Sequence, residues 1–238
     1  MNRSRIPAVA AALLAVTLAA CTPAAEPPGT THAPEPTAPS TTVPDPDPDV
    51  DTPILYWNDS SRTTNLGRGF TASACPGDAP LLCVFKDGEQ VGYLEALAFP
   101  IASFPSLDPD ADTDTNLALF ADGFFDDMAA DRATGCGDEY MFERIDPERI
   151  VLGKTPGIVF GFAGTMPNGD PSEYNLQYAT IVGDTILTIV AAAYDEGGCP
   201  GRDELSAFRS ADLIELRPHL EPALHESPLP PNLAREDS

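Results

Sequence analysis

The sequence predicts a domain of the α+β class, in which an antiparallel β-sheet is flanked by two main helices. Most apolar residues beyond the N-terminal segment lie within residues 53–220, and about 165 residues suffice for one domain with a real core. Short apolar runs in this range are separated by Gly, Pro, Asn or Asp, which predicts strands joined by turns. Two other stretches repeat apolar residues at helical intervals. Together these patterns predict a single globular domain over residues 53–220.

The first 20 residues have the order of an export signal. Arg3 and Arg5 form a short basic start, and the uncharged apolar residues 6–20 follow. As a helix this stretch rises only about 22 Å, which is short of the roughly 30 Å hydrocarbon core of a bilayer. We therefore predict a cleaved signal peptide over residues 1–20.

The segment Leu18-Ala19-Ala20-Cys21 resembles the bacterial lipobox, whose cysteine receives a diacylglyceryl thioether before cleavage. We expect Cys21 to become a lipid-modified N-terminus, with palmitate as an acyl group, on the outer face of the cell membrane. Two or three acyl chains attach a protein durably, whereas one alone anchors it only marginally. The alternative is an ordinary secretory cleavage site followed by an unmodified cysteine.

Residues 21–52 predict an extended linker. Pro, Thr, Ala and acidic residues dominate this segment, and residues 44–49 alternate proline with aspartate. Such a composition cannot build a core. Proline-rich chains favour polyproline II at about 3.1 Å per residue, so roughly thirty residues can hold a domain up to about 90 Å from the bilayer.

The mature chain is strongly acidic. Loss of the signal peptide removes Arg3 and Arg5 but no acidic residue, so 11 basic residues remain against 37 acidic ones and the net charge becomes −26. Nucleic acids and anionic headgroups are bound through basic patches, so we expect no nucleic acid partner and no membrane contact beyond the anchor. Cationic proteins and metal ions are compatible with this charge, and so is the simple solubility of an exported domain.

Strands are expected along most of the predicted domain. Residues 81–85 and 91–101 are apolar runs, and the turn-forming residues 86–89 between them predict a hairpin. Five further strands are predicted at residues 140–145, 150–154, 158–165, 174–182 and 185–194. The short connections between them predict an antiparallel meander.

The two helices are expected at residues 115–132 and 202–216. The first repeats apolar residues at helical intervals, and Asp114 is expected to cap its start. Its phenylalanines could line a ligand pocket, but we expect them to form a core face. The second closes one face of the sheet with Leu205, Phe208, Leu213 and Leu216. Residues 221–238 contain several prolines and predict a disordered tail.

Four cysteines lie in the predicted domain, namely Cys75, Cys83, Cys136 and Cys199, and an exported chain reaches a compartment that permits disulfides. Three pairings are open. Turn-forming residues separate Cys75 from Cys83, so we expect these two to pair and Cys136 to pair with Cys199. A zinc site made of the four thiols is the alternative, but the Cys-x-x-Cys spacing typical of such sites is absent.

Residues 108–116 alternate aspartate with other residues and are the best candidate for a cation site. Calcium takes about six to eight oxygen ligands, which alternating carboxylates suit. The candidate metal ligands are Asp108, Asp110, Asp112 and Asp114. The pattern departs from an EF-hand loop, because Thr113 stands where glycine is required and Leu119 where glutamate is required. A solvated acidic loop that leads into the next helix is the alternative.

The order of elements from residue 70 to residue 216 resembles the PsbP-like fold, which recurs in short exported lipoproteins of actinobacteria. The segments that carry the resemblance are Gly157-Ile158-Val159-Phe160-Gly161-Phe162, residues 174–182, Gly183-Asp184, residues 185–193 and the closing helix. Members of that group lack one shared enzymatic chemistry and act mostly as binding or assembly modules. The resemblance therefore implies a non-catalytic role and assigns no functional residue.

Residues for several common catalytic chemistries are missing from the predicted domain. Nucleophilic hydrolysis needs Ser or Cys beside a base, yet His219 is the only histidine of residues 53–220. Carboxylate pairs could serve a glycosidase, but among 37 acidic residues such pairs arise by chance. Arg132, Arg144 and Arg149 could bind an anion, but we expect them to pair with carboxylates. The sequence predicts neither an enzyme nor a cofactor.

These observations predict a lipid-anchored, non-enzymatic binding or assembly module at the cell envelope. Its expected partners are the membrane, through the anchor, and an envelope protein or a small apolar ligand. Two alternatives are a carrier of a small apolar or lipidic ligand and a calcium-dependent acidic domain.

Overall fold

The computed structural model describes residues 53–76, 81–136, 140–195 and 208–230. Its strands are β1 (Thr63–Gly67), β2 (Phe70–Ala74), β3 (Leu81–Lys86), β4 (Glu89–Pro100), β5 (Met141–Leu152), β6 (Thr155–Thr165), β7 (Pro171–Val182) and β8 (Thr185–Tyr194). Its two α-helices are α1 (Thr113–Gly135) and α2 (Ser210–Glu226). The predicted signal peptide, the linker and Cys21 lie outside the described residues.

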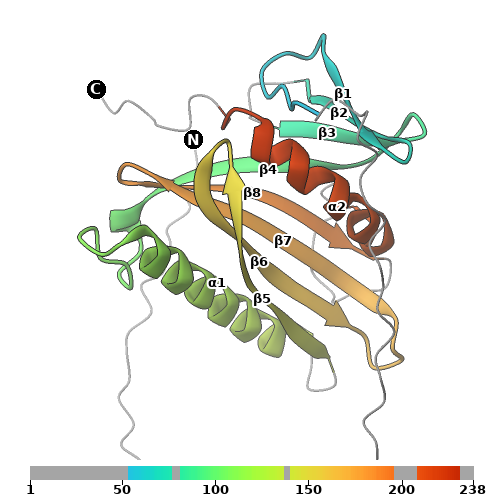
Figure 1. The fold of residues 1–238 in the computed structure, drawn as a ribbon. Coiled ribbons are helices and arrows are strands. Elements are labelled where there is room, and N and C mark those ends of the chain that lie inside the picture. Colours follow the sequence, from blue (N-terminus) through green and yellow to red (C-terminus); the bar gives the residue numbers. More distant parts are fainter. Residues whose placement is uncertain (1–52, 77–80, 137–139, 196–207, 231–238) are drawn as a thin grey trace, which may run out of the picture. The chain divides into compact units, whose positions relative to one another are not determined.

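The eight strands form one sheet in the order β1-β2-β3-β4-β8-β7-β6-β5 (Figure 1). Every neighbouring pair in this order is antiparallel. The predicted antiparallel sheet with two main helices is therefore confirmed, and the sheet makes up the larger part of the fold. Neither helix of the described residues is long and apolar enough to cross a membrane.

The first four strands form two hairpins, of which only the second was predicted. β3 and β4 meet at Asp87 and Gly88, whose φ angles of 52° and 89° suit the tight turns that join antiparallel strands. β1 and β2 are five residues each and contain only Leu66 and Phe70 as large apolar side chains. Such short strands carry too weak an alternating pattern to stand out in the sequence.

The two strands predicted at residues 140–145 and 150–154 are one strand, β5, at the edge of the sheet. The register with β6 shifts between Ile145 and Glu148, which marks a β-bulge. Pro147 lies in this bulge. A proline cannot donate a ladder hydrogen bond, but a bulge in an edge strand tolerates it.

The C-terminal helix was predicted too early and too short. It covers Ser210–Glu226, and residues 202–207 lie outside the described part of the chain. The disordered tail predicted from residue 221 is wrong as far as residue 230, because α2 continues through Pro222 and buries Ala223 and Leu224. Residues 231–238 are not described. Leucine burial outweighs the two missing donors of Pro218 and Pro222.

The two helices cover opposite faces of the sheet. Side chains of one strand alternate between the faces. On β7, Leu176 and Tyr178 belong to the core that contains Leu213 and Leu216 of α2, whereas Ala179 belongs to the core under α1. α1 packs against β5, β6 and β7, while α2 contacts β1, β5, β7 and β8.

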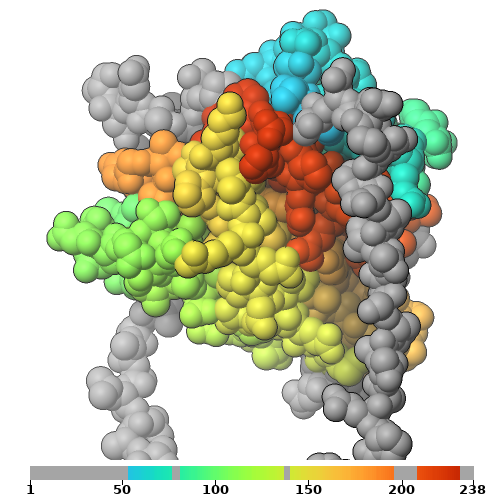
Figure 2. Space-filling view, viewed as in Figure 1, coloured from blue at the N-terminus to red at the C-terminus, as the bar shows by residue number. Residues whose placement is uncertain are grey.

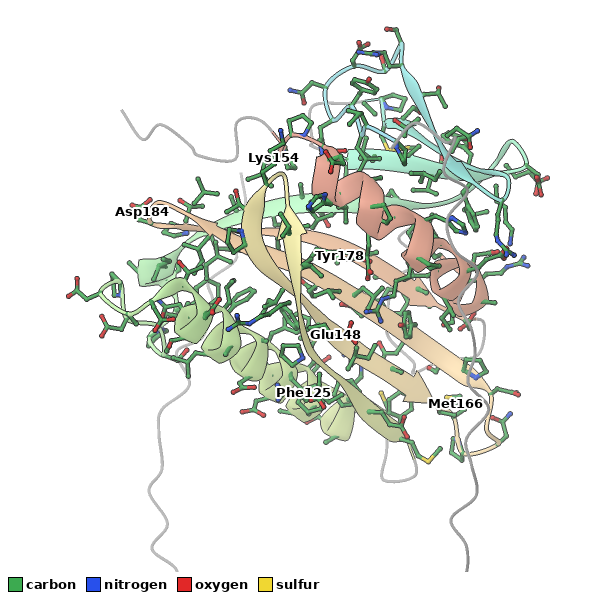
Figure 3. The ribbon with its side chains drawn as sticks, viewed as in Figure 1. Phe125, Glu148, Lys154, Met166, Tyr178 and Asp184 are labelled. Atoms are coloured by element: carbon green, nitrogen blue, oxygen red, sulfur yellow. A yellow bond between two sulfur atoms is a disulfide. The ribbon has the colours of Figure 1, made fainter. Side chains whose placement is uncertain are left out.

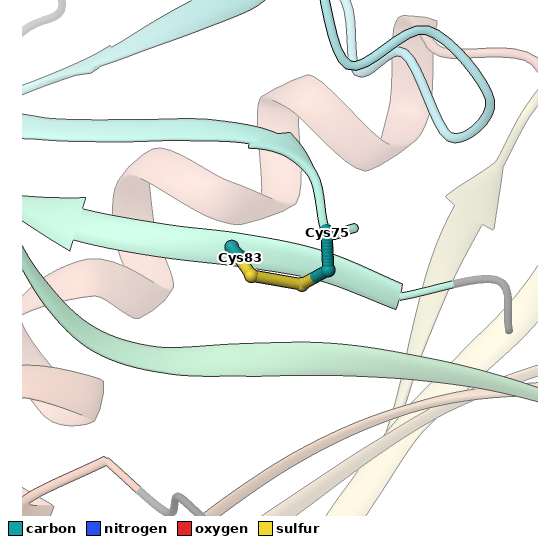
Figure 4. The surroundings of a disulfide bond; sticks show 2 residues. All are labelled: Cys75 and Cys83. Carbon is teal, nitrogen blue, oxygen red and sulfur yellow. A yellow bond between two sulfur atoms is a disulfide. The ribbon is translucent and has the colours of Figure 1, made fainter. Parts of the chain in front are cut away.

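The predicted disulfide between Cys75 and Cys83 is confirmed (Figure 4). It joins the end of β2 to β3, with the two Cα atoms 5.0 Å apart. Cys136 is also disulfide-bonded. Cys199 lies outside the described residues, so its pairing with Cys136 stays a prediction.

Candidate functional site

The acidic loop before α1 acts as a helix cap. The Asp112 carboxylate accepts hydrogen bonds from the backbone N–H and the hydroxyl of Thr115, at 2.9 and 2.7 Å. These bonds lower the pKa of Asp112. Asp108 accepts a hydrogen bond from the backbone N–H of Asp110 at 2.9 Å, which closes a local turn. The predicted cap at Asp114 is therefore wrong, and the helix begins two residues earlier than predicted.

In the structure the four predicted metal ligands are not grouped as the ligands of one ion, and the calcium site stays a prediction. Asp114 makes an ion pair with Arg149 at 2.5 Å, and Asp112 is engaged at the helix cap. In the part of the chain that the structure describes, no group of three or more His, Cys, Asp or Glu residues is arranged to hold a metal ion. The geometry thus favours the capping role of this loop.

We expect Asp112→Ala to lower the Tm by a few degrees, because α1 loses the acceptor for its first turn. Thermal unfolding followed by circular dichroism measures the change. Asp110→Ala is the matched control and should leave the Tm unchanged, because no hydrogen bond of the Asp110 side chain caps the helix. Millimolar calcium should change the Tm of neither variant. A calcium-dependent rise in Tm that both substitutions abolish would instead support the calcium alternative.

The most buried ionic group of the described residues lies where α1 ends against β7. The side chains of Arg132 and Glu173 are each 2% exposed. Arg132 Nε donates to Glu173 Oε1 at 2.5 Å and Arg132 Nη2 donates to Oε2 at 2.7 Å, so the pair is bidentate. The Tyr140 hydroxyl donates to Glu173 Oε1 at 2.5 Å. Asp131 pairs with the remaining edge of the guanidinium at 2.5 Å, and the Phe162 ring lies 5.3 Å from it.

In this Arg132–Glu173–Tyr140 network, the carboxylate of Glu173 is fully engaged by donors of the protein. Burial alone would lower the pKa of Arg132, but the hydrogen bond and charge of Glu173 outweigh it and raise that pKa. Burial and the hydrogen bond to Glu173 raise the pKa of Tyr140 to about 12. Both oxygens of Glu173 are occupied by donors of the protein itself. The network can therefore hold α1 to the sheet, but it presents no free carboxylate oxygen to a substrate.

The raised pKa of Tyr140 predicts a loss of stability at alkaline pH. An unfolded tyrosine titrates near pH 10, and Tyr140 in the fold titrates near pH 12, so the folded state keeps its proton longer. The contribution is complete below about pH 10 and disappears as the pH rises through about 12. Urea unfolding at a series of pH values should show this fall, and Tyr140→Phe should reduce it. Tyr93→Phe is the control; an equal reduction there would contradict the assignment.

Sequence reasoning found Arg132 but missed Glu173 and Tyr140. Arg132 and Glu173 are 41 positions apart, and neither lies in a motif. The only sequence signal was a charged residue, Glu173, at the border of a predicted apolar strand. With 37 acidic residues in the chain, that signal does not single out one carboxylate.

Other cations of the domain clamp the helices to the sheet. Lys86 on β3 lies 2.7 Å from Asp212 and 2.9 Å from Glu215, both on α2. Arg217 on α2 pairs with Glu221 at 2.8 Å and with Glu148 on β5 at 3.1 Å. Arg144 and Arg149 of β5 pair with Asp122 and Asp114 of α1. The predicted pairing of Arg132, Arg144 and Arg149 with carboxylates is therefore confirmed.

Phenylalanine rings fill the space between α1 and the sheet. Phe120 and Phe124 of α1 contact Phe160 of β6 with ring centroids 5.9 and 5.6 Å apart. Phe125 lies between α1 and β5, where its ring is 5.2 Å from that of Phe142 (Figure 3). Ring-on-ring packing of this kind is typical of a core. The predicted core face of α1 is confirmed.

Comparisons with known proteins identify no family for this chain. No family model matches it, and no curated protein matches it. One solved structure with a related arrangement is the solution structure of cyanobacterial PsbP (CyanoP) from Synechocystis sp. PCC 6803. It has 14% sequence identity and a TM-score of 0.36, with 66% of this chain and 78% of that chain covered. A likeness of this extent carries no functional argument.

Proposed function

We propose that the protein is a lipid-anchored, non-enzymatic binding or assembly module on the outer face of the cell membrane, with a PsbP-like domain. The observation that carries the non-enzymatic part is that both carboxylate oxygens of the buried Glu173 already accept hydrogen bonds from Arg132 and Tyr140. Their network is the most buried ionic group described, and general acid–base catalysis needs a proton-transfer group within hydrogen-bond reach of the substrate. The Glu173 side chain is 2% exposed and already accepts three hydrogen bonds.

The ionic clamps support the same proposal. Lys86, Arg132 and Arg217 each lie between two carboxylates that hold a helix or strand in place. These three positive charges therefore hold elements of the fold together. What remains for recognition is the outer surface of the domain, on which acidic side chains outnumber basic ones.

The anchor part of the proposal rests on the lipobox-like segment. Mass spectrometry of the protein extracted from native membranes should find a lipid-modified Cys21 as the N-terminus. Cys21→Ala is the matched variant and should leave the membrane fraction or accumulate as the uncleaved precursor. An unmodified Cys21 in a protein found outside the membrane fraction would contradict the anchor and make the protein secreted.

The binding part needs a comparison that removes contacts made by the anchor and the linker. We would crosslink intact cells and purify the protein next to a control in which residues 1–52 carry an unrelated folded domain. The native protein should enrich at least one envelope protein that the control does not. If both enrich the same proteins, the folded domain recruits no partner and the proposed function is contradicted.

A further inference from the structure

An apolar ridge runs along the outward face of α2. Ala211, Ile214, Pro218 and Pro222 are exposed and follow one another at spacings of three or four residues, so they share one side of the helix. We call these four residues the α2 ridge. Ile214 is 55% exposed, against 50% for Val182 at the end of β7. Figure 2 shows α2, in red, at the surface beside the yellow strands β5 and β6.

The two prolines remove two backbone hydrogen-bond donors from α2. A proline has no backbone N–H, so position 218 cannot donate to the carbonyl of Ile214, and position 222 cannot donate to the carbonyl of Pro218. Alanine at either position would restore the donor and favour the helix. Helix stability therefore does not account for two exposed prolines one turn apart.

Two ionic triads flank the ridge, one on each side. Lys86 lies between Asp212 and Glu215, at 2.7 and 2.9 Å, and Arg217 lies between Glu221 and Glu148, at 2.8 and 3.1 Å. A helix turns by about 100° per residue, which places Asp212 and Glu215 on one side of Pro218 and Glu221 on the other. Each triad has two carboxylates for one cation and so carries one excess negative charge.

The outermost carboxylates of the triads are open to a partner. The Glu148 side chain is 64% exposed and the Glu215 side chain is 39% exposed. Figure 3 labels Glu148 on β5. The α2 face thus combines an exposed isoleucine, two exposed proline rings and a negative rim on both sides.

We propose that the α2 ridge docks a basic amphipathic protein segment, in which an apolar side chain is bordered by lysine or arginine. This inference rests on the proposed binding function and names the surface and the chemistry of the partner. The apolar side chain would cover Ile214 and the proline rings, while the cations meet Glu148 and Glu215. A second copy of the chain is disfavoured, because ridge-to-ridge contact brings the negative triads together. An anionic bilayer is disfavoured as well, because its headgroups carry the same sign of charge as the triads.

The test uses an amphipathic helical peptide of leucine and lysine as the probe, at about physiological ionic strength. Ile214→Glu should raise its Kd for the full chain at least about tenfold, because the apolar contact is lost. Val182→Glu is the matched control, with a side chain of similar exposure. Both substitutions add a negative charge, which strengthens non-specific attraction to the peptide, so weaker binding of Ile214→Glu alone identifies the ridge.

A second variant separates binding from stability. Replacement of both prolines, Pro218→Ala with Pro222→Ala, should raise the Tm because the helix regains two backbone donors, and should weaken peptide binding because the proline rings are lost from the ridge. Opposite signs of the two effects cannot come from a misfolded helix. Binding of the Ile214→Glu variant as tight as that of the wild type would overturn the inference. Equal binding of a leucine–glutamate peptide, or wild-type self-association that Ile214→Glu abolishes, would overturn it as well.

The crosslinking comparison distinguishes failure of this inference from failure of the proposed function. If the Ile214→Glu protein keeps every partner of the wild type, the binding function stands and the surface lies elsewhere. If the wild type has no partner beyond those of the anchor control, the binding function itself fails. Loss of a partner with Ile214→Glu but not with Val182→Glu is the result expected here, with crosslinks from α2 to a basic amphipathic segment of that partner.

Discussion

Glu173→Gln is expected to lower the free energy of unfolding by about 3–5 kcal/mol, because it leaves a buried guanidinium without its carboxylate. Arg132 is 2% exposed, and its other carboxylate, Asp131, is 60% exposed and screened by water. Urea unfolding measures the loss. Trp57 is the single tryptophan and is buried in the core under α2, so its fluorescence reports on the transition.

A double variant shows whether the loss of stability comes from the unpaired buried charge of Arg132 or from the shape of the site. Arg132→Met combined with Glu173→Leu replaces the pair by apolar side chains of similar size, and buried pairs tolerate this exchange far better than loss of one partner. We expect the double variant to recover most of the stability lost in Glu173→Gln. A loss below about 1 kcal/mol in the single variant would show that water reaches Arg132.

Phe160→Ala is expected to cost about 3–5 kcal/mol, since it removes a buried ring from the layer between α1 and the sheet. Phe160 is 2% exposed and contacts both Phe120 and Phe124. Urea unfolding measures this loss too. Phe99→Ala is the matched control: Phe99 is only half-buried and contacts one ring, that of Phe104, so a smaller loss is expected.

The same variant tests the carrier alternative. If the phenylalanine layer enclosed a ligand cavity, Phe160→Ala would change the affinity for a fluorescent fatty acid more than it changes stability. A packed core predicts the reverse, namely a large loss of stability with no fatty acid bound by the wild type. Tight binding of the fatty acid by the wild-type domain would favour the carrier.

Local patterns predicted those elements that local forces dominate. The hairpin between β3 and β4 followed from Asp87 and Gly88, which adopt the left-handed backbone that its turn requires. α1 followed from its helical repeat of apolar residues, although its start was misplaced by two positions. Asp112 and Asp114 are chemically equal candidates for the cap, and the fold uses Asp112, whose carboxylate accepts from the backbone N–H of Thr115.

Where distant contacts outweigh local preference, the predictions from sequence were wrong. Pro218 and Pro222 favour an early end of α2, yet Leu220 and Leu224 are buried against the sheet and carry the helix to Glu226. Pro147 favours a break, yet β6 pairs with both sides of it and makes β5 one strand. In each case burial or strand pairing is worth more than the missing backbone donors.

By itself the sequence determined the class of the fold, the core face of α1, the disulfide between Cys75 and Cys83, and the pairing of Arg132, Arg144 and Arg149 with carboxylates. Each of these depends on neighbouring residues or on composition. Only the tertiary structure decided that Ile214 stays exposed and that Arg132 meets Glu173. It also decided that Lys86 of β3 pairs with acids of α2, and that Arg217 of α2 pairs with Glu148 of β5. These contacts join residues 41, 126, 129 and 69 positions apart, and pairing at such separations depends on how the chain folds back, which no local pattern records.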